Sequence, residues 1–132
     1  PVEFRTAGTF KFPDEEKVFK AKFDELQLDG LVNVLGQRVG EERWDEYRQA
    51  DILFFPTKYA SESFGCVVVE AMAHALPVVA SDWHGPKDIV LHEHTGLLCP
   101  IENPRAFAAA LEKLIHNPEL RSLFGQNGYE RY

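Results

Sequence analysis

ESFGCVVVEAMAHALPVV, at residues 62–79, places two glutamates eight positions apart on either side of a Phe-Gly step. Glu62 precedes a predicted helix start, whereas Glu70 lies in an otherwise apolar segment. An unpaired charge in such surroundings costs several kcal/mol or shifts its pKa, so we expect a polar group beside Glu70. The valines at residues 67–69 leave open whether this part is a helix or a buried strand, because β-branched side chains favour strands.

Length and composition favour a single globular domain over residues 1–132. The chain is 45% hydrophobic and 27% charged, which is typical of a folded domain with its own core. Its formal net charge is −7 and its basic residues are scattered, so we expect no nucleic-acid-binding surface. The expected ligand is therefore a small molecule.

Cysteine usage and hydropathy indicate a cytoplasmic chain. Cys66 and Cys99 occur without a C-x-x-C pair, so two reduced thiols are expected rather than a disulfide. No run approaches the roughly 20 apolar residues of a membrane helix. The first residues also lack the charged and apolar regions of a signal peptide. We therefore expect no transmembrane segment in this chain.

Short strand-like runs alternate with helix-length segments. Strands are predicted at residues 2–7, 31–35, 51–55, 76–80 and 95–99, and helices at 14–27 with Asp14 as the N-cap, at 42–49, and after Asn103-Pro104 and Asn117-Pro118. This alternation predicts an α/β fold with a doubly wound, Rossmann-like parallel sheet. Ligands in such folds bind outside the carboxyl ends of the strands, so one rim is expected for the loops that begin at Gly8, Gly36, Pro56 and Ser81.

The loop at residues 56–64 is long for a strand-to-helix connection, which is typical of a binding loop. If a helix begins near Phe64 or Gly65, the free amides of Gly65, Cys66 and Val67 favour an anion there. Gly65 would also let a phosphate approach the backbone closely. We therefore expect a phosphate position at this helix start.

The two glutamates would face this position from different sides. Helical side chains lean toward the helix N-terminus, so Glu70 could accept hydrogen bonds from vicinal hydroxyls in the same crevice. Glu62 would sit on the opposite side of the anion. A solvated loop acid is the alternative interpretation of Glu62 taken alone.

The ordered motifs between residues 50 and 99 resemble the donor-binding half of retaining GT-B-fold glycosyltransferases of the group 1, family 4 type. This large group includes glycogen and sucrose synthases and many capsule and lipopolysaccharide enzymes. The matching motifs are Pro56-Thr57, an E-x7-E pair at Glu62 and Glu70 with Phe64-Gly65, residues 70–73, residues 77–81, Gly85, residues 88–90 and residues 95–98. Upstream, residues 34–39 and 47–51 resemble the segment that edges the nucleotide base.

The resemblance implies a role for each matching residue. Glu62 matches the acid that contacts the transferred sugar, and Glu70 matches the acid that binds the ribose hydroxyls. The remaining donor-binding positions are the backbone at Phe64, Gly65 and Cys66, the base-edging Gln37, Arg38 and Val39, and Gly8 at the end of the first strand.

The resemblance also implies a reaction. A hexosyl group would pass with retention from a nucleotide-diphosphate sugar to an acceptor glycan or lipid-linked glycan, as in polysaccharide biosynthesis. No cofactor and no metal are expected, because the helix dipole and basic side chains stabilise the leaving diphosphate. His92 and His94 are accordingly expected to be surface residues rather than zinc ligands. The alternative that stays open is a GT-B-like nucleotide-sugar-binding or epimerase module without transferase activity.

A response-regulator receiver domain has a similar length and alternation. It needs a phospho-accepting aspartate at the carboxyl end of its middle strand, where this chain has Phe55-Pro56. Asp51 lies at the other end of that strand, which excludes this class.

Two positions depart from the family pattern. Ala75 stands where the helix of relatives usually ends at glycine. Alanine in a left-handed conformation costs about 1 kcal/mol, so we expect a different local turn there. His84 stands where relatives have the first glycine of a pair, and it is expected to be an exposed loop residue, with a contact to the sugar pocket as the alternative.

Relatives carry further segments ahead of the part that this chain resembles. These are an acceptor-binding domain, and a strand with a loop whose Arg and Lys neutralise the donor phosphates. We therefore expect a fragment of a protein of about 350 to 400 residues, and an isolated chain that binds nucleotide weakly and transfers no sugar. The full-length protein is expected in the cytoplasm, either free or peripheral to the inner face of the membrane.

The absent strand would lie at the centre of the sheet, between the strands predicted at residues 2–7 and 51–55. Either these two strands pair directly or another chain fills the gap. Self-association through an unpaired strand is therefore an expectation as well.

Overall fold

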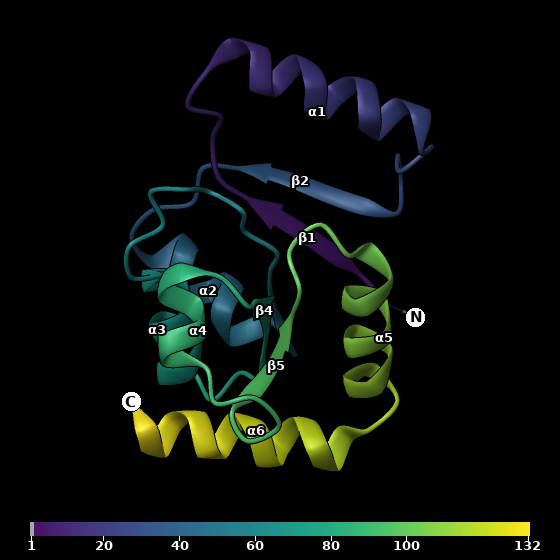
Figure 1. Ribbon diagram of the computed structural model, residues 1–132. Coiled ribbons are helices and arrows are strands. Elements are labelled where there is room, and N and C mark those ends of the chain that lie inside the picture. The colour runs from purple at the N-terminus through teal and green to yellow at the C-terminus, as the bar shows by residue number, and fades with distance from the viewer. Residues whose placement is uncertain (1) are drawn as a thin grey trace. The chain divides into compact units, whose positions relative to one another are not determined.

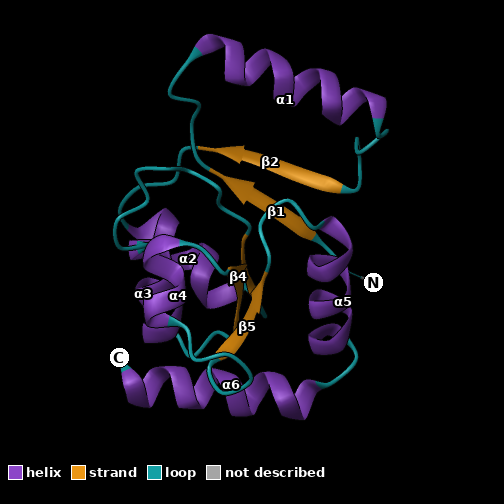
Figure 2. Ribbon diagram, in the orientation of Figure 1, coloured by secondary structure: helices purple, strands orange, loops and turns teal. Residues whose placement is uncertain are grey.

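The computed structural model describes residues 2–132, in which strands and helices alternate (Figure 2). In chain order the elements are β1 (Phe4–Ala7), α1 (Pro13–Glu25), β2 (Val32–Gly36), α2 (Glu41–Gln49), β3 (Leu53–Phe55), α3 (Cys66–Ala73), β4 (Val78–Ser81), α4 (His84–Ile89), β5 (Gly96–Cys99), α5 (Pro104–Ile115) and α6 (Pro118–Arg131). They form two compact units, Pro1–Trp44 and Asp45–Tyr132. The predicted α/β class with parallel strands is confirmed.

The five strands divide between two sheets. β1 pairs in parallel with β2, and β4 pairs in parallel with both β3 and β5. Each sheet lies within one unit, so the choice between direct pairing of β1 with β3 and a gap filled by another chain stays a prediction. Within residues 2–132, β1 and β3 each keep one edge without a strand neighbour.

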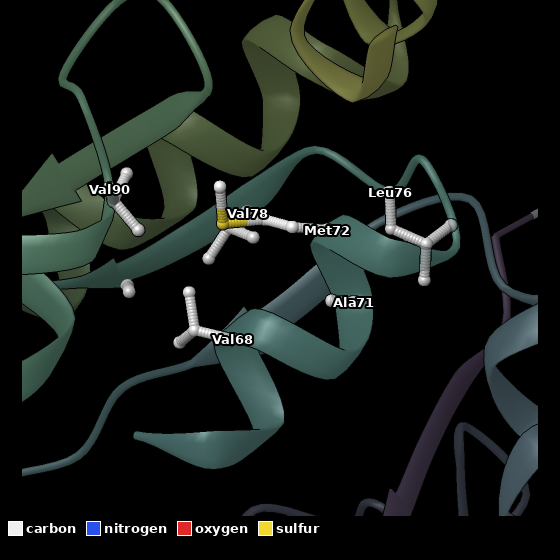
Figure 3. Close-up of a cluster of buried hydrophobic side chains, with 7 residues drawn as sticks. Val68, Ala71, Met72, Leu76, Val78 and Val90 are labelled. Atoms are coloured by element: carbon white, nitrogen blue, oxygen red, sulfur yellow. The ribbon is translucent and has the colours of Figure 1, made fainter. Parts of the chain in front are cut away.

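The three-stranded sheet of the second unit is covered on both faces. Side chains alternate between the faces of a strand, and accordingly Val78 and Ala80 of β4 belong to one buried cluster and Val79 to the other. The first cluster includes Val68, Ala71, Met72, Leu76 and Val90 (Figure 3). The second includes Leu97, Cys99, Phe107, Ala110, Leu114 and Phe124. In Figure 1, α5 lies on one side of β4 and β5, and α3 and α4 lie on the other.

Local signals explain where the last two helices begin. The side chain of Asn103 accepts a hydrogen bond from the Ala106 amide at 3.1 Å, and that of Asn117 accepts one from the Leu120 amide at 3.0 Å. Proline follows each asparagine at the first helical position, where a missing N–H costs nothing. Both predicted helix starts are confirmed.

None of the helices described in residues 2–132 is long and apolar enough to cross a membrane.

The start of α1 differs from the prediction. Phe12 rather than Asp14 is the N-cap, and Pro13 takes the first helical position. The carboxylate of Glu15 accepts a hydrogen bond from the Phe12 amide at 3.3 Å. An acid in the third helical position thus satisfies the cap amide, while Asp14 and the other first-turn acids favour the positive end of the helix dipole.

α3 ends in a left-handed turn although the residue there is alanine. Ala75 has a φ of 54°. Its amide donates to the Met72 carbonyl at 2.9 Å, and the Leu76 amide donates to the Ala71 carbonyl at 3.0 Å, which is the Schellman pattern. The expectation of a different turn is therefore wrong. The turn is also packed from outside, because a Cβ on Gly125 of α6 would overlap the Ala75 carbonyl oxygen.

Candidate functional site

Loops at the carboxyl end of the three-stranded sheet are tied to one another. These loops are residues 56–65, 82–83 and 100–103. Lys58 forms an ion pair with Glu102 at 2.8 Å, and the hydrogen bond and charge of this ammonium lower the pKa of Glu102. The indole N–H of Trp83 donates to the Tyr59 carbonyl at 3.2 Å. Of the expected rim, the loops that begin at Pro56 and Ser81 are therefore in contact, and the loop after β5, which was not predicted, joins them.

Phe64 and Gly65 are fixed by their packing against α4. A Cβ on Gly85 would lie 2.5 Å from the Phe64 carbonyl carbon, so only glycine allows this approach. Gly65 has a φ of 74°, and a Cβ there would lie 3.4 Å from the ring of Pro86. Glycine at position 65 thus suits a left-handed backbone beside Pro86, and the close approach of a phosphate there stays a prediction.

Glu62 closes the binding loop onto the start of α3. Its Oε1 accepts a hydrogen bond from the Gly65 amide at 2.9 Å, and its own amide donates to the Tyr59 carbonyl at 3.1 Å. The prediction of a free Gly65 amide is therefore wrong. α3 begins one residue later, so the amides of Cys66 and Val67 occupy the first turn, where no preceding helical carbonyl is available. The candidate anion position is reduced to these two amides.

The valines that follow are helical, which settles the alternative between helix and strand. α3 turns Val68, Ala71 and Met72 into the core (Figure 3). Successive helical residues are about 100° apart, so Glu70 projects from the face opposite this apolar stripe. Its side chain is half-buried rather than enclosed.

The polar group expected beside Glu70 is the hydroxyl of Tyr47 on α2. Tyr47 Oη lies 2.9 Å from Glu70 Oε2 and 3.5 Å from the Val67 carbonyl oxygen. The tyrosine ring is also stacked on His74, with centroids 5.2 Å apart and planes inclined by 20°. Glu70 is therefore held from a neighbouring helix.

Tyr47 and His74 were not among the predicted site residues. Tyr47 lies in the segment that resembles the base-edging part of the family, but its contact with Glu70 spans 23 positions. His74 Nδ1 lies 2.8 Å from the Glu70 carbonyl oxygen, four positions earlier. His74 is the C-cap of α3, and a histidine at a helix end, where it can bond one of the last carbonyls, is the local signal for this second contact.

The other predicted residues lie in the first unit, where Gly8 follows β1 and residues 37–39 follow β2. The Gly8 amide donates to the Gly36 carbonyl at 2.9 Å, which joins the two strand ends. Gln37 and Val39 are exposed and Arg38 is half-buried. The structure thus gathers Gly8, Gln37, Arg38 and Val39 at one sheet edge, and Glu62, Phe64, Gly65, Cys66 and Glu70 around one helix start.

His84 takes the left-handed conformation that a glycine would adopt more easily. Its φ is 39°, its side chain is exposed, and its ring meets that of Trp83 edge-on with centroids 4.3 Å apart. The exposure agrees with the prediction, but the predicted loop position is wrong, because His84 is the first residue of α4. Because the next residue, Gly85, contacts the Phe64 backbone, this strained position adjoins the binding loop.

His92 and His94 have structural partners. His92 Nδ1 accepts a hydrogen bond from the Leu98 amide at 3.0 Å, and the His94 carbonyl accepts one from Asn127 at 2.8 Å. Within residues 2–132, no three His, Cys, Asp or Glu side chains form a group that could hold a metal ion.

Comparisons with known proteins cover almost the whole chain. The family described as Glycosyl transferases group 1 matches residues 4–131. D-inositol 3-phosphate glycosyltransferase from Kineococcus radiotolerans is 38% identical over 114 residues, which are 80% of this chain and 26% of that protein.

Solved structures give the same picture. Sucrose-phosphate synthase from Thermosynechococcus elongatus superposes with a TM-score of 0.82 at 32% identity, covering 96% of this chain and 32% of that one. HepE from Anabaena in complex with UDP superposes with a TM-score of 0.88 at 25% identity, covering 98% of this chain and 35% of that one. The chain thus spans about a quarter to a third of the length of these proteins.

Proposed function

The chain belongs to the glycosyl transferases group 1 family, with a GT-B-type fold, and we propose that it is the donor-binding part of a hexosyltransferase. The enzyme would take a nucleotide-diphosphate sugar as donor and transfer the sugar with retention, without a bound metal or cofactor. An acceptor glycan or lipid-linked glycan would bind to a segment outside this chain. The enzyme would act in polysaccharide synthesis, in the cytoplasm or at the inner face of the membrane.

The arrangement of Glu62 and Glu70 around the first turn of α3 is the observation that carries this proposal. Glu70 would accept hydrogen bonds from the ribose hydroxyls, because its carboxylate projects away from the core. The amides of Cys66 and Val67, with the positive end of the helix dipole, would take the diphosphate. They would also stabilise the charge that develops on the leaving diphosphate.

Glu62 would contact the transferred sugar with the oxygen atom that the Gly65 amide does not occupy. An ionised carboxylate has two oxygens and about four acceptor sites, so the Gly65 bond to Oε1 leaves capacity for sugar hydroxyls. That bond would at the same time fix the direction of the carboxylate. Phe64, Gly65 and Cys66 supply the backbone between the two acids.

Solved relatives support the choice of donor class. HepE holds UDP in one structure and UDP-glucose in another, and each superposes on nearly the whole of this chain. In the proposal, the base would lie beside Gln37, Arg38 and Val39, near the strand end at Gly8.

Calorimetric titration of the full-length protein with UDP, GDP, ADP and their glucose and mannose conjugates tests the proposal. We expect one nucleotide to bind and to raise the free energy of unfolding by about 2.7 kcal/mol at 100 times its dissociation constant. Glu70→Ala should weaken binding at least about tenfold, because a hydrogen-bonded charged group is lost. Glu112→Ala, at an exposed glutamate of α5, is the matched control.

Glu62→Gln separates sugar contact from nucleotide contact. The glutamine can still accept the hydrogen bond of the Gly65 amide, so the loop should keep its form. Affinity for the free nucleotide should therefore stay within about twofold, whereas sugar transfer should fall at least about tenfold. No binding of any nucleotide would contradict the proposal, and epimerisation of the sugar without transfer would replace it with the alternative module.

A further inference from the structure

The hydroxyl of Tyr47 on α2 is hydrogen-bonded to the carboxylate of Glu70 on α3. The carboxylate Oε2 lies 2.9 Å from the phenolic oxygen, and the Val67 carbonyl oxygen lies 3.5 Å from it. A tyrosine hydroxyl has a single proton to donate, and a carboxylate at the shorter distance is the stronger acceptor. The proton is therefore directed at Glu70.

His74 limits the movement of both partners. Its Nδ1 faces the Glu70 carbonyl oxygen at 2.8 Å, and because a carbonyl can only accept, Nδ1 must carry the proton. The imidazole ring of His74 also stacks on the ring of Tyr47, with centroids 5.2 Å apart. The histidine thus braces the tyrosine ring while it is itself anchored to the backbone of Glu70.

We propose that Tyr47, braced by His74, is the positioning residue that aims the Glu70 carboxylate at the ribose hydroxyls of the donor. This inference rests on the proposed function, in which Glu70 binds ribose. A glutamate side chain loses much rotamer freedom when it is fixed, and a bond made before the ligand arrives removes that cost from binding. A bond at Oε2 is compatible with ribose hydroxyls donating to the same carboxylate, since its two oxygens offer about four acceptor sites.

The readout that separates positioning from a merely structural role is the discrimination between ribose and its dideoxy analogue. Isothermal titration of the full-length protein would use UDP, GDP and ADP, each beside its 2′,3′-dideoxy counterpart, which offers Glu70 no hydroxyl. Tyr47→Phe keeps the ring and its stack on His74 but removes the hydroxyl. We expect it to weaken the ribonucleotide that binds best by about fivefold to tenfold and to leave the dideoxy nucleotide within about twofold.

A double substitution tests whether the two residues act together. Tyr47→Phe added to Glu70→Ala should cause no further loss of ribonucleotide affinity, because the hydroxyl acts only through the carboxylate. Tyr129→Phe, at an exposed tyrosine of α6, removes a hydroxyl elsewhere and should change neither affinity. Thermal unfolding of the ligand-free variants shows that they are folded.

The possible results of these titrations distinguish failure of the positioning role from failure of the proposed function. Equal weakening of ribo- and dideoxynucleotides by Tyr47→Phe, or no weakening, would overturn the positioning role and leave the proposed function standing. Unchanged discrimination in Glu70→Ala would overturn the ribose assignment of Glu70 and this inference with it. Absence of binding to the unaltered protein would overturn both.

Discussion

The two compact units, Pro1–Trp44 and Asp45–Tyr132, are both built from parallel strands and helices but bury very different amounts of apolar surface. All four residues of β4 are buried, whereas three of the four in β1 are exposed and none is buried. α5 buries Phe107, Ala110 and Leu114, whereas α1 buries none of its residues. Strand pairing and an amphipathic helix are therefore not enough for a core, because a parallel sheet needs cover on both faces.

The first unit has aromatic contacts of its own, but they are open to solvent. Phe19 meets Phe10 and Phe23 at centroid distances of 5.2 and 5.7 Å, while Phe10 remains 41% exposed. Contacts that bury little area contribute little hydrophobic free energy. We infer that the first unit opens more readily than the second, as regions with few buried contacts do.

Leu114→Ala and Val18→Ala give the largest contrast. Leu114 of α5 is fully buried and Val18 of α1 is 71% exposed. Truncation of the buried leucine should lower the free energy of unfolding by about 3 kcal/mol through lost burial and a cavity. Truncation of the exposed valine should change it by less than about 0.5 kcal/mol. Urea unfolding measures both, and equal losses would show that the first unit is packed as tightly as the second.

Much of the fold could be predicted because its signals are local. The Asn-Pro pairs before α5 and α6 specify helix starts through contacts within three residues, and each expected strand occurs within about two residues of its predicted end. What neighbours β1 and β3 across the expected gap stays a prediction, because strand neighbours are set by the whole sheet. The cap of α1 was misplaced by two residues, since Glu15 satisfies the amide of Phe12 rather than of a later residue.

The candidate site was predicted in its residues but not in its contacts. E-x7-E motifs place Glu62 and Glu70 on the two sides of a helix start, and the structure has them there. The partners of both acids depend on how a loop folds back and how two helices meet. Glu62 accepts a hydrogen bond from the Gly65 amide, which the sequence analysis expected to be free. Glu70 accepts one from the hydroxyl of Tyr47, and no spacing in the sequence indicates that contact.

Ala75→Gly and Gln27→Gly compare the two units at matched backbone positions. Both residues follow a helix in the left-handed conformation, with φ of 54° and 52°. Glycine removes a strain of about 1 to 2 kcal/mol but costs unfolded-state entropy, so each change should stabilise its own unit by about 0.5 kcal/mol. If the first unit opens separately, only Ala75→Gly should raise the free energy of global unfolding.

Hydrogen exchange followed peptide by peptide provides the measurement for this pair. Ala75→Gly should slow exchange in β3, β4 and β5, and Gln27→Gly should slow it only in β1 and β2. Equal slowing of all five strands by either change would mean that the units unfold together, which would remove the difference between them.

The smallest expected effect is a thiol-linked pH dependence in the second unit, which contains both cysteines. Cys99 is buried in its core and donates to the Ala106 carbonyl at 3.6 Å, and burial raises the pKa of this thiol. Below the ordinary thiol pKa of about 8.5, the folded and unfolded states are both protonated and nothing is lost. As the pH rises past that value, the unfolded chain releases the proton first, so the free energy of unfolding falls until the folded thiol also ionises.

Urea unfolding between pH 7 and 10 measures this effect. The free energy of unfolding should decline less with pH for Cys99→Ala than for the unaltered protein. Cys66→Ala, at an exposed thiol, should follow the unaltered protein. Identical declines in all three would mean that water reaches Cys99, and the second unit would then be less well sealed than its buried strands indicate.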